Sequence, residues 1–133
     1  MSLSQADRVW NRAAMQAGGT SPREGDKALT ALLLFHGLAM NGGVHHALEC
    51  LGASELEAAK HGFEHYGLVD VAAFLACTDA PPLVEWTDVS EAAANESYMR
   101  MVPDDDYLAR RFEAAFNEHP DEYSPLLDDD GLV

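Results

Sequence analysis

Apolar residues recur along this chain at helical intervals, and glycine and proline separate the apolar segments. In the last strong segment, four apolar side chains fall at i, i+4, i+7 and i+8, which is one face of a helix. These four are Leu108, Phe112, Ala115 and Phe116. The segment that ends near Met40 has leucines on nearly all its sides, which is typical of a central buried helix. The pattern therefore predicts an all-α fold.

Capping residues and helix breakers delimit about six to seven helices. The expected N-caps are Ser4, Asp26, Ser54 and Asp88, because a side-chain oxygen in that position accepts from the first free N–H groups. The expected helices cover residues 5–17, 26–40, 44–51, 54–66, 68–77, 88–101 and 104–118. The fifth segment also permits a strand, since it is rich in valine.

Length and composition predict one compact domain. The chain has 133 residues, of which 47% are hydrophobic, and this is enough for a single core. We expect a helical bundle over residues 1–124 and an acidic, flexible tail over residues 125–133. The first residues lack the apolar core of a signal peptide, and the longest apolar run is too short to span a bilayer. These features favour a cytoplasmic protein without a membrane span.

Three further residues carry expectations about burial. Cys50 and Cys77 lie in apolar, helix-like segments without C-x-x-C spacing, and we expect two buried thiols rather than a disulfide. His36 lies within the central helix, so we expect it to be buried, neutral and hydrogen-bonded to a backbone carbonyl.

The strongest signal in the composition is negative charge. Aspartate and glutamate total 23 against 8 lysines and arginines, which gives a net charge of −15. A charge of this size repels nucleic acid and anionic membranes and favours basic partners. A purely solubilising surface, or adaptation to high salt, is the alternative interpretation.

The acids are concentrated in the second part of the chain. Residues 79–133 contain 15 acids and three arginines, a net of −12, whereas the first 78 residues carry −3. Carboxylates at 104–106 are explained locally by the start of a helix, and Asp106 is spaced to pair with Arg110. Local effects do not explain the sum, so we expect a surface that binds a basic protein. The candidate contacts are Asp104, Asp105, Asp106, Glu113, Glu118, Asp121 and Glu122.

The stretch HGFEH, residues 61–65, matches the H-x-x-E-H pattern of zinc hydrolases. A helical projection puts His61 and His65 opposite the apolar stripe, so the pair is expected to face solvent and not a cleft. The alternative function is a metal-binding protein or small metal-dependent hydrolase that uses His61, Glu64 and His65, with His46 and Cys50 as further ligands. No other catalytic constellation is present, so the leading expectation is a protein that is not an enzyme and has no cofactor.

Asn41, Gly42 and Gly43 close the expected central helix, and Val44 follows them. Further positions continue this pattern through A-L-x-x-(I/L)-G-A and an N/H-P-x-x-(F/Y) ending. These positions are Ala47, Leu48, Leu51, Gly52, Ala53, His119, Pro120 and Tyr123. Together they resemble the DNA-mimic-protein (DMP)-like family, a bacterial family, over roughly residues 28–124. Val44 stands where phenylalanine is common in that family.

The resemblance implies an all-α domain that presents an acidic surface similar to duplex DNA. Its partner would be a basic protein such as a DNA-binding transcription regulator, and a homodimer is a further implication. Asn41, Gly42 and Gly43 would then be structural residues that shape the turn between two core helices. The combined expectation is an acidic protein-binding domain, a DNA mimic, that does not itself bind nucleic acid.

Overall fold

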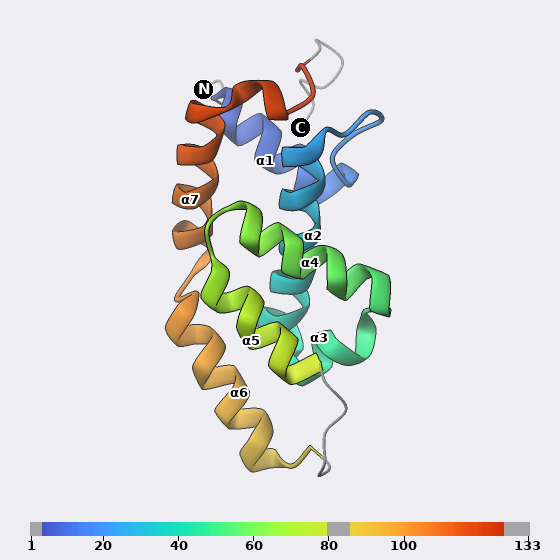
Figure 1. Ribbon diagram of the computed structural model, residues 1–133, viewed down its shortest axis with the longest axis vertical. Helices are drawn as coiled ribbons and strands as arrows, with labels where there is room; N and C mark the ends of the chain where they lie inside the picture. The colour runs from blue at the N-terminus through green and yellow to red at the C-terminus, as the bar shows by residue number, and fades with distance from the viewer. Residues whose placement is uncertain (1–3, 80–85, 127–133) are drawn as a thin grey trace.

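The computed structural model describes residues 4–79 and 86–126, and all regular structure in these ranges is helical (Figure 1). This confirms the predicted all-α fold. The expected break at Pro81-Pro82 and the acids 128–130 lie outside the described residues. The elements are α1 (Gln5–Gln16), α2 (Glu24–Gly42), α3 (Val44–Cys50), α4 (Ala53–His65), α5 (Val69–Asp79), α6 (Asp88–Met101), α7 (Asp105–Glu118) and the 3₁₀ helix η1 (Pro120–Glu122).

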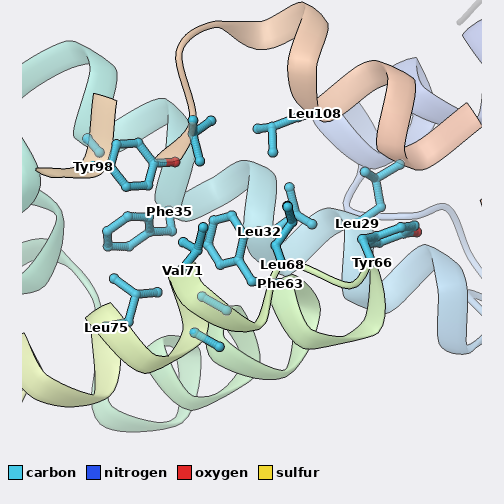
Figure 2. Close-up of a cluster of buried hydrophobic side chains, with 14 of the residues drawn as sticks. Leu29, Leu32, Phe35, Phe63, Tyr66, Leu68, Val71, Leu75, Tyr98 and Leu108 are labelled. Carbon is cyan, nitrogen blue, oxygen red and sulfur yellow. The ribbon is translucent and has the colours of Figure 1, made fainter. Parts of the chain in front are cut away.

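Helix α2 is the central element of the core. It packs against α1, α3 and α4, and α4 in turn packs against α5 (Figure 1). Leu32 and Phe35 of α2 are at most 2% exposed. The Phe35 ring packs edge-on against the Phe63 ring of α4, with the ring centroids 6.1 Å apart (Figure 2). The prediction that the segment ending near Met40 is buried and central is therefore confirmed.

The crossing of α2 and α4 depends on a glycine within HGFEH. A Cβ atom at Gly62 would lie 2.5 Å from the backbone carbonyl oxygen of Ala28, which is closer than real Cβ contacts come. Only a residue without a side chain lets the two backbones approach this closely. Gly62 and Phe63 thus place the buried face of α4 against α2.

Helices α6 and α7 follow one another along one long edge of the molecule (Figure 1). Each has 14 residues, so each is about 21 Å long. Helix α6 contacts α3 and α5, whereas α7 contacts α1 and η1. The apolar face predicted for α7 is confirmed, since Leu108 and Phe112 are buried and Ala115 and Phe116 pack partly buried against the core.

Helix starts are predicted less accurately than helix identity. Ser4 caps α1 as expected. The N-caps of α2, α4 and α6 are Arg23, Gly52 and Thr87. They replace the expected Asp26, Ser54 and Asp88, which are wrong by one to three residues. In α2 and α4 the acid three residues past the cap accepts from the N–H of the cap residue, so it marks the third helical position.

Two other expectations are settled by the packing. Segment 68–77 is helical, since α5 spans Val69–Asp79. Cys50 and Cys77 are exposed, so the prediction of buried thiols is wrong. Cys50 is the last residue of α3, and Cys77 lies on the side of α5 away from the buried Leu75. A short apolar segment does not reveal which of its residues other helices cover. In the described residues no helix is long and apolar enough to cross a bilayer.

Candidate functional site

Carboxylates line the edge formed by α6, α7 and η1, which we call the acidic edge. Residues 88–122 contain ten carboxylates and three arginines, a net of −7. Eight of the ten carboxylate residues are exposed, and the other two are partly exposed. They are Asp88, Glu91, Glu96, Asp104, Asp105, Asp106, Glu113, Glu118, Asp121 and Glu122.

The three aspartates that begin α7 have three different local partners. Asp104 is the N-cap, and its carboxylate accepts from the N–H of Tyr107 at 2.9 Å. Asp105 contacts the ring of His36, and Asp106 forms the predicted ion pair with Arg110. All three remain exposed, so these contacts leave carboxylate surface accessible to a partner.

The other predicted contacts divide between the middle and the far end of α7. Glu113 lies with Asp105 and Asp106 around one cavity. Glu118 ends the helix, and Asp121 follows it in η1. Glu122 is held away from this group, since its carboxylate lies 2.9 Å from Nε2 of His65. The structure therefore brings some of the predicted contacts together and spreads the rest along the edge.

Paired bases neutralise part of the acidic edge. Arg100 pairs with Glu96 at 3.0 Å, and Arg110 pairs with Asp106. The guanidinium of Arg111 instead lies over the Tyr107 ring, 5.6 Å from its centroid. Two of the three arginines on the edge are thus occupied by acids, and the net negative charge persists.

His36 forms a buried link between three helices. Its Nε2 lies 2.6 Å from the Asp105 carboxylate and its Nδ1 lies 2.8 Å from the Tyr98 hydroxyl. An ionised carboxylate only accepts, so Nε2–H donates to Asp105, and Nδ1 forms the second hydrogen bond of the ring with the Tyr98 hydroxyl. The expectation of a carbonyl partner is wrong, because side chains from α6 and α7 occupy both ring nitrogens.

Two cavities meet at this link, and both lie beside α1. The larger, of about 740 Å³, lies between α1 and α2 and is mostly apolar; we call it the apolar compartment. The smaller, of about 300 Å³, lies between α1 and α7; we call it the acidic compartment. Trp10 and Asp105 line both, so the two compartments adjoin.

The acidic compartment combines carboxylates with aromatic rings. Its carboxylates come from Asp7, Asp105, Asp106 and Glu113, of which Asp106 is paired with Arg110. Trp10 and Phe112 line it as well, with ring centroids 5.8 Å apart. Phe112 is buried, whereas Trp10 is partly exposed. Carboxylates beside the partly exposed Trp10 ring attract cations, both by charge and by cation–π contact.

The histidines of HGFEH do not converge on one point. His61 is 71% exposed and lies 3.5 Å from Glu57, as expected for a solvent-facing residue. His65 is only 18% exposed, and its Nε2 lies 2.9 Å from the Glu122 carboxylate, so the prediction that it faces solvent is wrong for this residue. Glu64 is exposed, and the proposed further ligands His46 and Cys50 contact each other, with Sγ 3.6 Å from Nε2. Among the described residues, no three such side chains are placed to hold a metal ion.

The Asn-Gly-Gly element shapes the junction between α2 and α3. Gly43 has φ +97°, a left-handed conformation that favours glycine, and its N–H donates to the Ala39 carbonyl at 2.7 Å. The next N–H, that of Val44, donates to Asn95 on α6 at 2.8 Å. Asn41 and Gly42 form the exposed last turn of α2.

Sequence reasoning missed the contribution of α1 to the site. Asp7 and Trp10 lie on one face of α1. For this helix the sequence predicted only the extent and the N-cap, Ser4. The signal was available, because Ala6, Trp10 and Ala13 recur at helical spacing beside Asp7. What the sequence did not contain was the position of α7 against that face.

Comparison with protein-family models, with curated proteins and with solved structures finds no match to this chain. The resemblance to the DMP-like family therefore stays a prediction, and the function rests on the geometry and charge described above.

Proposed function

We propose that this chain is a cytoplasmic, non-enzymatic domain that binds a basic protein through its acidic edge, in the manner of a DNA backbone. The observation that carries the proposal is the alignment of α6 and α7 along one long edge, with ten carboxylates against three arginines. Acids one helical turn apart lie about 5–6 Å from each other at Cβ, which is comparable to phosphate spacing along a DNA strand.

Electrostatics supports a basic macromolecule as the partner. A basic protein that releases its counterions on DNA would release them equally on a row of exposed carboxylates. Nucleic acid itself would be repelled by the same row. This chain would therefore compete with DNA for the basic partner and would not bind to the partner–DNA complex.

The test compares two variants that each lose three negative charges. The edge variant carries Asp104→Asn, Glu118→Gln and Asp121→Asn, and asparagine keeps the N-cap of α7. The control variant carries Glu49→Gln, Glu64→Gln and Asp70→Asn, which are exposed acids on α3, α4 and α5. A lysate of the cells that produce this protein is first enriched for DNA-binding proteins on DNA-cellulose. The enriched fraction is then passed over each immobilised protein.

We expect the wild type and the control variant to retain the same basic proteins, and duplex DNA to displace them. The edge variant should retain much less, and the affinity of a retained protein should fall steeply between about 50 and 200 mM salt. Equal retention by both variants, or an affinity that ignores salt, would contradict the proposal.

A further inference from the structure

We infer that the two compartments beside α1 form one docking groove for a basic amphipathic segment of the partner protein. This inference rests on the proposed function, and it names the contact through which a basic partner gains more than charge attraction. The segment would place apolar side chains in the apolar compartment and lysine or arginine side chains in the acidic compartment.

The apolar compartment exposes large hydrophobic side chains from both helices that line it. Met15 of α1 is 73% exposed, and Leu34 and Met40 of α2 are 44% and 46% exposed. Three such residues around one hollow offer apolar surface that a partner would bury. No Asp, Glu, Lys or Arg occurs between residues 28 and 48, so α2 contributes no formal charge to this compartment.

The acidic compartment supplies the complementary half of the groove. Four carboxylates line it, and no lysine or arginine is among its lining residues within the described part of the chain. Arg110 pairs with one of the four, Asp106. The partly exposed ring of Trp10, which packs on the buried ring of Phe112, gives a cationic side chain apolar surface for its stem and a ring face for its charge.

The link at His36 sets how the two halves meet. It holds the Asp105 carboxylate at the boundary, where Asp105 and Trp10 belong to both walls. An amphipathic helix carries a charged face and an apolar face side by side, as the two adjoining compartments require. Such helices bind grooves by apolar anchors at i, i+3, i+4 and i+7. A segment rich in charge alone would fill only the smaller compartment.

The test uses a leucine–lysine peptide of about 18 residues with leucines at helical spacing. A scrambled peptide of the same composition and a lysine–glycine peptide of the same charge are the comparisons. Trp86→Phe leaves Trp10 as the single tryptophan, so its fluorescence reports on the groove. Ala109→Lys fills the acidic compartment, and Ala114→Lys, exposed on the same helix outside both compartments, is the matched control.

We expect the amphipathic peptide to bind more tightly than the other two and to change the Trp10 emission. Ala109→Lys should weaken this binding at least about tenfold, and Ala114→Lys about twofold or less. Met15→Glu should weaken it as well, whereas Val69→Glu on α5, also an exposed apolar position, should not. If Ala109→Lys fails to fold, the comparison of Met15→Glu with Val69→Glu still tests the groove.

Three results would overturn the groove. If all three peptides bind equally and Ala109→Lys matches Ala114→Lys, the groove is wrong and the acidic edge remains as the binding surface. If no peptide binds, the groove and the proposed function both fail. If the chain alone self-associates and Ala109→Lys abolishes this, the groove holds a second copy instead.

Discussion

Arg12 and Asp26 form an ion pair inside the fold, where both side chains are at most 2% exposed. The Asp26 carboxylate also accepts from the N–H groups of Arg23 and Ser124, at 3.0 and 2.7 Å. Arg12 donates to the Ser124 carbonyl at 2.9 Å, so the pair fastens the segment after η1 to α1 and α2. Pairing and hydrogen bonding of this kind offset the cost of burying the two charged groups.

Removing one charge of this pair should destabilise the protein strongly. We expect Asp26→Asn to lower the free energy of unfolding by about 3 kcal/mol, because it removes the charge that pairs with Arg12 inside the fold. Asp106→Asn makes the same change in an exposed pair and should cost about 0.5 kcal/mol or less. Urea denaturation of both variants measures the difference, and equal losses would refute the structural role of Asp26.

Three buried tyrosines give the fold a dependence on alkaline pH. Burial, and then the hydrogen bond to Tyr123, raises the pKa of Tyr66. Burial and the Asp105 charge raise the pKa of Tyr98. Burial also raises the pKa of Tyr123 to about 12, although its hydrogen bond with Tyr66 acts in the opposite direction. All three hydroxyls are therefore neutral in the fold at pH values where an unfolded chain would lose those protons.

Stability should fall as pH rises above the ordinary tyrosine value. Since the folded pKa values exceed the value of 10.0 in the unfolded chain, the stabilisation is complete below pH 10 and is lost progressively above it, for Tyr123 up to about 12. Urea midpoints at increasing pH should show this decline, and Tyr123→Phe should reduce its slope. A midpoint that is constant from pH 8 to 11 would contradict the assignment.

At the scale of helices, the sequence correctly predicted which segments are helical, but it predicted less well where each helix begins and which of its faces is buried. Every segment with helical spacing in the described ranges is a helix, since periodicity and breakers act within a few residues. The predicted N-caps of α2, α4 and α6 are wrong, because the N–H groups of Arg23, Gly52 and Thr87 donate to the side chain of the third helical residue. Which face of α1 or α3 is covered depends on other helices, so the sequence made no prediction for Trp10 and a wrong one for Cys50.

A paired glycine experiment tests the α2–α4 crossing. Gly62→Ala should destabilise the fold by about 1–3 kcal/mol, since the new methyl group would meet the Ala28 carbonyl oxygen. Gly37→Ala has no heavy atom within 4 Å of its new Cβ, and it should stabilise α2 by about 0.5–1 kcal/mol. Thermal unfolding of the two variants separates the outcomes, and the same sign for both would show that the crossing is looser than described.

For the molecule as a whole, the net charge of −15 predicts that salt stabilises the fold. Repulsion among exposed carboxylates opposes folding, and added salt screens it over about 10 Å at 0.1 M. We expect the unfolding temperature to rise by several degrees between about 10 and 200 mM salt, and to rise less for the edge variant. If the unfolding temperatures of the edge and control variants respond equally to salt, the carboxylates of α7 and η1 repel one another no more than those elsewhere on the surface.

The sequence by itself determined the helical class, the burial of α2 and the placement of the charge late in the chain. These properties depend on neighbouring residues and on composition. Only the tertiary structure decided that His36 meets Tyr98 and Asp105, which lie 62 and 69 residues away, and that α1 and α7 enclose a groove. Contacts across such separations follow from how helices cross, and helix crossings are set by packing over the whole core, not by any one segment.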